Sequence, residues 1–131
     1  MLPDFLNLTL NGSTVADNGS ENINLLGTGS PTVGINGTTG DDTLISSNVD
    51  DTMTGDTGSD IFAFAVNSGA DIITDFIVDD DQLDVSALGI TALGQMTFNG
   101  EVVDFNGAND EQVTLTGVVA NSLDASSFIF A

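Results

Sequence analysis

The chain has 131 residues, of which 20 are acidic and none is Lys, Arg or His, so its formal net charge at pH 7 is −20. Without cationic side chains it has no clamp for phosphate groups and no basic patch, which excludes nucleic-acid binding and attraction to an anionic membrane. Without His or Cys, the common catalytic triads, zinc sites and thiol chemistry are excluded, so we expect no enzymatic activity.

The composition indicates a folded domain whose carboxylates need an external cation. Hydrophobic residues make up 40% of the chain, more than an acidic disordered tail contains. Two like charges about 4 Å apart repel by about 4 kcal/mol near a protein surface. A compact fold that gathers carboxylates therefore needs a bound ion, and oxygen ligands on flexible loops favour Ca²⁺. The alternative is a halophile-type acidic surface that is kept soluble by its charge.

Residues 1–18 form the first predicted unit, with a strand at residues 6–10 where Leu alternates with polar residues. This strand either caps the next segment or pairs with a sheet edge on a neighbouring subunit. The start lacks the basic region and long apolar core of a secretory signal peptide, so we expect any export signal elsewhere. Because Met1 precedes the bulky Leu2, we expect a whole gene product. No stretch approaches the roughly 20 apolar residues of a membrane span.

Residues 19–76 contain a nine-residue repeat, clearest in GTTGDDTLI (37–45), SSNVDDTMT (46–54) and GDTGSDIFA (55–63). Glycine recurs at the first and fourth positions, Asp at the sixth and an apolar residue at the eighth. The shared positions are occupied by Gly37, Gly40, Asp42, Leu44, Asp51, Met53, Gly55, Gly58, Asp60 and Phe62. After a two-residue insertion, Gly69, Asp71 and Ile73 repeat half of the pattern. Upstream, residues 19–27 fit the frame with Asn24 and Leu26.

Such blocks predict an all-β fold, a parallel β-roll or β-solenoid, in which two blocks make one coil. The glycines allow tight turns and close approach of carbonyl groups to an ion. The Asp supplies a charged oxygen, and the apolar residue two places later points inward from a short strand. The expected stacks along the two edges of the roll are Asn24, Asp42 and Asp60, and Asp51 and Asp71. The expected inward ladders are Leu26, Leu44 and Phe62, and Met53 and Ile73.

The predicted calcium ligands are the sixth-position carboxylates and the glycine carbonyls of the turns. They belong to Gly37, Gly40, Asp42, Asp51, Gly55, Gly58, Asp60, Gly69 and Asp71. The block 46–54 has Ser46, Ser47 and Val49 where glycines are expected, so we expect its turn to hold calcium poorly. The remaining acidic residues near the turns are expected to be solvated or weak ligands: Asp41, Asp50, Asp56 and Asp75. A Gly- and Asp-rich loop region without periodic structure is the alternative.

With these blocks, the chain resembles the RTX family, and residues 59–88 are similar to the segment that follows the β-roll in serralysin-type metalloproteases. The matching pieces are Asp60-x-Phe62-x-Phe64, Gly69-x-Asp71-x-Ile73, Asp75-Phe76 and Asp81-x-Leu83-Asp84-Val85-Ser86. The zinc-binding protease motif of that family is absent, so the resemblance implies no protease activity. It implies type I secretion from a Gram-negative bacterium through an uncleaved C-terminal signal, followed by folding on calcium outside the cell or at its surface.

Residues 77–131 are predicted to form an antiparallel β cap. Runs of alternating residues at 96–98, 102–105 and 112–116 indicate strands, and Asn99-Gly100 is typical of a two-residue hairpin loop. A short helical turn is expected near Val85–Leu88. The tail 123–131 looks like a type I secretion signal, and the alternative is an ordinary final β-strand.

These features favour a secreted structural protein that folds on Ca²⁺ and self-assembles, as a homo-oligomer or polymer, into a filament, layer or matrix. One alternative is a non-catalytic C-terminal secretion and folding module of a larger hydrolase. A second is an adhesion or recognition module, although the absence of Trp and Tyr removes the usual aromatic platforms for glycans.

Overall fold

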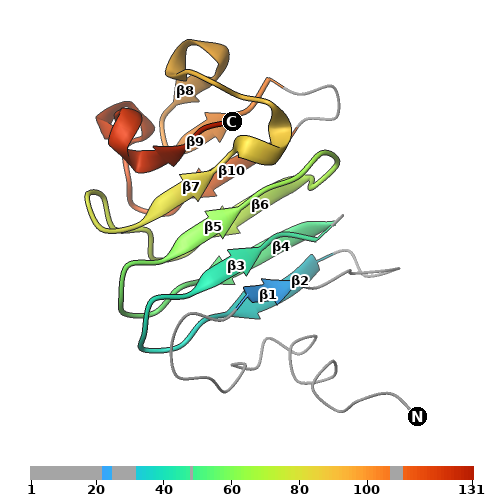
Figure 1. Ribbon diagram of the computed structural model, residues 1–131, viewed down its shortest axis with the longest axis vertical. Coiled ribbons are helices and arrows are strands. Elements are labelled where there is room, and N and C mark those ends of the chain that lie inside the picture. Colours follow the sequence, from blue (N-terminus) through green and yellow to red (C-terminus); the bar gives the residue numbers. More distant parts are fainter. Residues whose placement is uncertain (1–21, 25–31, 48, 107–110) are drawn as a thin grey trace.

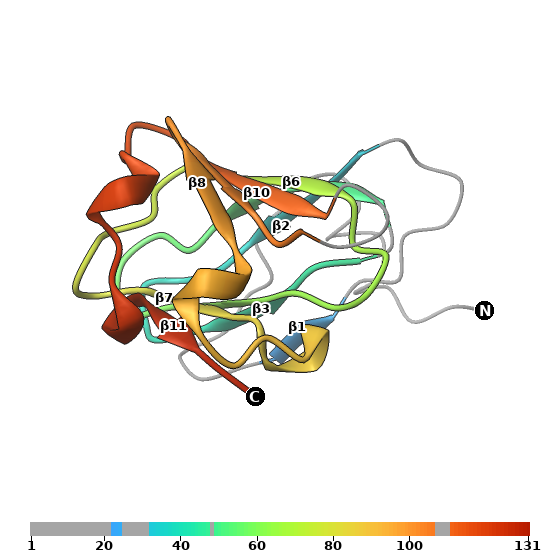
Figure 2. The ribbon, with the colours of Figure 1, turned by 90° about the horizontal axis from the view of Figure 1, so that it is seen from above.

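The computed structural model describes residues 22–24, 32–47, 49–106 and 111–131, and the fold in these ranges is all-β. Short strands stack from β1 and β2 at one end of the molecule to β8 and β9 at the other (Figure 1). Seen along the stack, two sheets face each other across a core (Figure 2). The predicted parallel β-roll is confirmed. No helix in the described ranges is long and apolar enough to cross a membrane.

Within the described residues, one sheet has five strands, all parallel, in the order β1-β3-β5-β7-β11. These strands are β1 (Asn22–Asn24), β3 (Thr43–Ile45), β5 (Ile61–Ala63), β7 (Gln82–Asp84) and β11 (Phe128–Ile129). The other sheet has six strands in the order β2-β4-β6-β10-β9-β8. They are β2 (Thr32–Asn36), β4 (Asp50–Thr54), β6 (Ala70–Ile73), β10 (Gln112–Leu115), β9 (Val102–Asp104) and β8 (Thr97–Asn99).

The core consists of apolar ladders that run from coil to coil, as the eighth position of the repeat predicts. Leu44 lies beside Phe62 in one sheet and Met53 beside Ile73 in the other, and all four side chains are fully buried. Leu83 extends the first ladder beside Phe62. Burial of one such side chain stabilises the fold by roughly 1.5–3 kcal/mol relative to its exposure, so these ladders hold the two sheets together.

The register at the first strand differs from the predicted frame for residues 19–27. Asn24 pairs with Ile45, and Ile23 pairs with Leu44. The prediction that Asn24 stacks on Asp42 is therefore wrong, because the connection from β1 to β3 is longer than two equal blocks. Leu26 and the predicted strand at residues 6–10 lie outside the described residues.

The second half of the chain closes one end of the roll and is only partly antiparallel. β8 and β9 form an antiparallel hairpin, and β9 pairs in the same way with β10. β10 also pairs in parallel with β6, so the cap continues one sheet of the roll. Asn99 is still paired with Val102, which places the hairpin loop at Gly100 and Glu101, one residue later than predicted.

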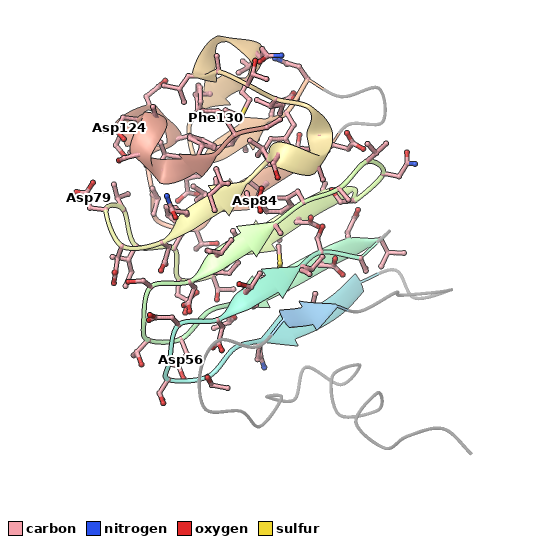
Figure 3. The ribbon with its side chains drawn as sticks, in the orientation of Figure 1. Asp56, Asp79, Asp84, Asp124 and Phe130 are labelled. Atoms are coloured by element: carbon pink, nitrogen blue, oxygen red, sulfur yellow. The ribbon has the colours of Figure 1, made fainter. Side chains whose placement is uncertain are left out.

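Short 3-10 turns and a final strand complete the cap. The expected helical turn is present at η1 (Ser86–Leu88), and η2 (Leu93–Gln95), η3 (Ala120–Ser122) and η4 (Ala125–Ser127) follow. The tail forms β11, which pairs in parallel with β7, as the final-strand alternative predicts. The ring of Phe128 contacts those of Phe98 and Phe130, with centroids 6.1 and 5.7 Å away. These rings pack at the cap end, where Figure 3 labels Phe130.

Candidate metal centre

The turns that connect the two sheets stack in two rows, one along each edge of the roll. The first row contains the turns before β3, β5 and β7, at residues 37–42, 55–60 and 74–81. The second row contains the turns before β4 and β6, which include residues 46, 47 and 49 and residues 64–69. Figure 3 shows Asp56 and Asp79 projecting from the edge formed by the first row.

The predicted glycines lie where consecutive turns come close together. A Cβ atom at Gly37 would lie 2.7 Å from the carbonyl oxygen of Gly55, and one at Gly58 would lie 2.5 Å from that of Gly40. Gly58 also has a φ of 121°, which L side chains rarely adopt. In the second row, a Cβ atom at Gly69 would lie 2.5 Å from Oδ1 of Asp50. The structure therefore brings all five predicted glycines into the stacked turns.

The sixth-position aspartates are buried and link one coil to the next. Asp42, Asp51, Asp60 and Asp71 are each at most 2% exposed. Oδ1 of Asp60 accepts the backbone N–H of Asp42 at 3.0 Å. In the second row, Oδ1 of Asp71 accepts the N–H of Asp51 at 2.8 Å. The carboxylates of Asp60 and Asp71 thus each accept one hydrogen bond from the preceding turn of their row.

Asp81 is a further member of the first row that the sequence analysis did not assign. Its side chain is 3% exposed, and its Oδ1 accepts the N–H of Asp60 at 2.9 Å. The spacing Asp81-x-Leu83 repeats that of Asp60-x-Phe62, so an Asp-x-apolar pattern was available. The longer turn before β7 shifted it out of the nine-residue frame.

In three turns the second carboxylate oxygen is satisfied by the residue four places earlier. The backbone N–H groups of Thr38, Ser47 and Ile77 donate to Oδ2 of the aspartate in their own turn. The N···O distances are 2.5, 2.6 and 2.8 Å, to Asp42, Asp51 and Asp81 respectively. We call these the closed turns. The hydroxyls of Thr38 and Ser47 also donate to Asp42 and Asp51, so the turn of block 37–45 is closed in the same way as that of the degenerate block 46–54.

In the other two turns this oxygen has no partner. Oδ2 of Asp60 and Oδ2 of Asp71 are buried without any hydrogen bond. Four residues earlier stand Asp56 and Asn67, with φ values of 73° and 69°. Their N–H groups donate instead to Asp75 (2.8 Å) and to Glu111. We call these the open turns.

Burial makes the negative charge of these aspartates costly. Burial, together with the nearby carboxylates of Asp81, Asp42 and Asp75, raises the pKa of Asp60 to about 7. Burial, with Asp51 and Asp50 nearby, raises the pKa of Asp71 to about 8. The pKa values of Asp51 and Asp81 are also raised, chiefly by burial. Because the chain has no cationic side chain, only a proton or a bound cation can compensate them.

The open turns fit a hard cation such as Ca²⁺. Each offers a buried carboxylate oxygen without a partner, and in the first row any side chain at Gly55 would collide with the Asp60 carboxylate. Within the described ranges, no three acidic side chains form a group that could hold a metal ion. Most ligands would therefore be backbone carbonyls of the glycine turns, which Ca²⁺ accepts among its 6–8 oxygen ligands.

The acidic residues expected to be solvated have structural contacts as well. Asp41, Asp50 and Asp56 are exposed and Asp75 is partly exposed. Oδ1 of Asp41 accepts the N–H of Ser59 at 2.8 Å, and Oδ1 of Asp50 accepts that of Ala70 at 3.0 Å. Asp75 accepts the N–H groups of Gly55 and Asp56. They therefore cross-link adjacent turns, a role that their sequence positions did not indicate.

Comparison with known proteins agrees with this arrangement. No family model matches the chain. The mannuronan C5-epimerase AlgE5 of Azotobacter vinelandii is 38% identical over 80 aligned residues, which cover 49% of this chain and 8% of the epimerase. The solution structure of the AlgE6R3 subunit from the Azotobacter vinelandii mannuronan C5-epimerase matches 90% of this chain and 77% of that subunit, with 27% identity and a TM-score of 0.61. These similarities support the RTX-type β-roll family. The closer likeness to serralysin-type proteases stays a prediction from the sequence.

Proposed function

We propose that the chain is a secreted, calcium-binding β-roll of the RTX type whose folding requires Ca²⁺ at its buried turn carboxylates. The observation that carries this proposal is the pair of buried, unpartnered oxygens on Asp60 and Asp71, in a chain of net charge −20 without a cationic side chain. At low calcium these carboxylates oppose folding. At the millimolar calcium found outside cells, metal binding adds to the folding free energy.

We further propose a non-catalytic role as a folding module of a larger secreted protein of a Gram-negative bacterium. The AlgE5 match supports this role, because the chain spans 8% of the length of that epimerase. Export would follow the type I route implied by the RTX resemblance, with the C-terminal tail as the signal. The activity and substrate of the epimerase belong to that protein.

Self-assembly into a filament or layer, and adhesion to another surface, remain predictions from the sequence. Negative-stain microscopy of the calcium-loaded chain distinguishes them: regular polymers support self-assembly, whereas uniform single particles favour the module.

Thermal unfolding followed by circular dichroism tests the proposed function. We expect a cooperative unfolding transition in millimolar CaCl₂. In EGTA, the midpoint temperature of this transition should be much lower or the transition should be absent, and MgCl₂ should restore little of it. Mg²⁺ requires near-ideal octahedral geometry and keeps its waters, whereas these turns offer irregular carbonyl oxygens. Identical melting curves in calcium and EGTA would contradict the proposal.

A further inference from the structure

Glu111 is a buried carboxylate that lies outside the repeats yet beside a calcium turn. It is 3% exposed and precedes β10, the strand that joins the cap to the roll. The next residue, Gln112, pairs with Ala70, and its N–H donates to the carbonyl of Gly69 at 3.1 Å. The register therefore places Glu111 against the turn before β6, which is the open turn of the second row.

Within the described residues, the contacts of Glu111 supply no positive charge. Its side chain accepts the N–H of Asn67, and its backbone carbonyl accepts the N–H of Phe105 at 3.0 Å. Both donors are neutral amides. A buried carboxylate is stable as a charge only when it is paired or coordinates a metal, and this chain supplies no cationic side chain for pairing.

The same turn holds two further buried oxygens without partners. Ser68 is 1% exposed and its Oγ has no hydrogen bond. It lies between Asn67, whose N–H holds Glu111, and Gly69, whose carbonyl is bonded to β10. Oδ2 of Asp71, in a side chain that is also 1% exposed, is the second such oxygen. Buried hydroxyls and carboxylates without partners are rare in folded proteins, and both of these oxygens belong to the segment that Glu111 contacts through Asn67.

The first row contains a related arrangement. There, Asp75 accepts the N–H groups at the start of the turn that leaves Oδ2 of Asp60 unpartnered. In both rows, then, a carboxylate from a later strand connection holds the amide that would otherwise close the turn. In the second row this carboxylate comes from the cap.

We propose that Glu111 and the turn at residues 67–71 form a divalent-cation site at the junction of the β-roll and its cap. This inference rests on the proposed calcium-dependent folding, and it adds an oxygen ligand from outside the nine-residue repeats. The site makes the docking of β10 on β6 depend on calcium, so the cap orders together with the last coil.

The variant E111Q tests this site, with calcium binding measured by isothermal titration calorimetry. Glutamine can still accept the N–H of Asn67 but supplies no negative ligand. We expect E111Q to bind one Ca²⁺ fewer per chain than the wild type, or to bind one ion at least tenfold more weakly. The matched control is E101Q, since Glu101 is exposed in the cap hairpin and accepts the N–H of Gly117. It should bind like the wild type.

The outcomes separate this inference from the proposed function. If the wild type binds no Ca²⁺, the proposed function fails. If the wild type binds but E111Q has the same stoichiometry and affinities, the junction site alone is overturned. If E111Q does not fold at any calcium concentration, the variant S68A tests the junction site instead. If no ion is bound at this site, removal of an unpartnered buried hydroxyl leaves stability unchanged or raises it. An unchanged calcium concentration at the folding midpoint of S68A therefore overturns the site. A raised calcium concentration at the midpoint supports it.

Discussion

Thr38 and Ser47 each donate a backbone N–H to the aspartate four residues later, whereas Asp56 and Asn67 donate theirs to carboxylates from later strand connections. The left-handed φ values of Asp56 and Asn67 accompany this difference. Asp and Asn tolerate that conformation better than most residues. The same sixth-position aspartate is therefore satisfied in a closed turn and left with a free oxygen in an open one.

Replacement of an open-turn aspartate should weaken calcium binding. Mutation of a residue that merely orients a metal ligand typically lowers metal affinity by about 10–100-fold. We therefore expect Asp60→Asn to raise the calcium concentration at the folding midpoint at least tenfold. Asp104→Asn is the control, because Asp104 lies outside the stacked turns and its side chain accepts the nearby N–H of Asn106 at 2.7 Å. Equal midpoints for the two variants in a calcium titration would refute the assignment.

The raised pKa values predict an unusual pH dependence for the metal-free protein. The folded-state pKa values of Asp60 and Asp71 are about 7 and 8, against an ordinary value of 3.8. Protonation therefore favours the fold, and this stability is lost as pH rises through the folded pKa values. In EGTA, we expect the free energy of unfolding to fall from about pH 4 to about pH 8, between the ordinary and the folded-state pKa values, the opposite of ordinary acid denaturation.

Urea denaturation at acidic pH, and the folded fraction by circular dichroism as the pH rises and the metal-free protein unfolds, measure the effect. Asp71→Asn should flatten the dependence in EGTA, because its amide does not titrate. Saturating calcium should flatten it in the wild type too, since the ion replaces the protons. A metal-free protein that becomes more stable toward pH 9 would contradict the buried-carboxylate account.

At the scale of the turn, consecutive turns stack so closely that some positions have room for glycine alone. Gly58 combines a φ of 121° with a hypothetical Cβ 2.5 Å from the Gly40 carbonyl. Forced backbone conformations cost on the order of 1–3 kcal/mol each, and the clash adds to this. We expect Gly58→Ala to lose more than about 2 kcal/mol of unfolding free energy in calcium. Gly94→Ala, with nothing within 4 Å of its added Cβ, should change it by less than about 0.5 kcal/mol. Chemical denaturation of both variants checks the contrast.

The nine-residue frame predicts strands and core well wherever coils keep a constant length. Leu44, Phe62, Met53 and Ile73 were placed inward from position eight alone, and all are fully buried. The frame fails at β1, where a longer connection changes the register. It also misses Asp81, which follows a longer turn. Sequence periodicity carries no information on how many residues a loop inserts before pairing resumes.

Contacts between distant segments could not be predicted from the repeat. Glu111 follows a loop far along the chain, and only the parallel pairing of β10 with β6 brings it to the turn before β6. The division into open and closed turns depends on which backbone N–H groups are already engaged. The sequence therefore predicts the turn aspartates as a class of candidate ligands, and the structure adds which of them have a second carboxylate oxygen without a hydrogen bond.

At the scale of the whole molecule, the negative charge opposes the compact fold, and we expect a bound cation to relieve this repulsion. Five aspartates are buried in the stacked turns: Asp42, Asp51, Asp60, Asp71 and Asp81. The apolar ladders draw the two sheets together, and the turn rows bring these carboxylates close. Calcium binding and folding are thus expected to be one cooperative event, because a preformed site rarely exists in an unfolded chain.

A calcium titration at about pH 8, followed by far-UV circular dichroism from EGTA to about 10 mM Ca²⁺, tests this claim most directly, since it covers the affinity range of extracellular calcium modules. We predict a largely unfolded spectrum in EGTA and a single, steep gain of β-structure as calcium rises, reversible on chelation. A β-sheet spectrum that is already complete in EGTA and unchanged by calcium would contradict the account.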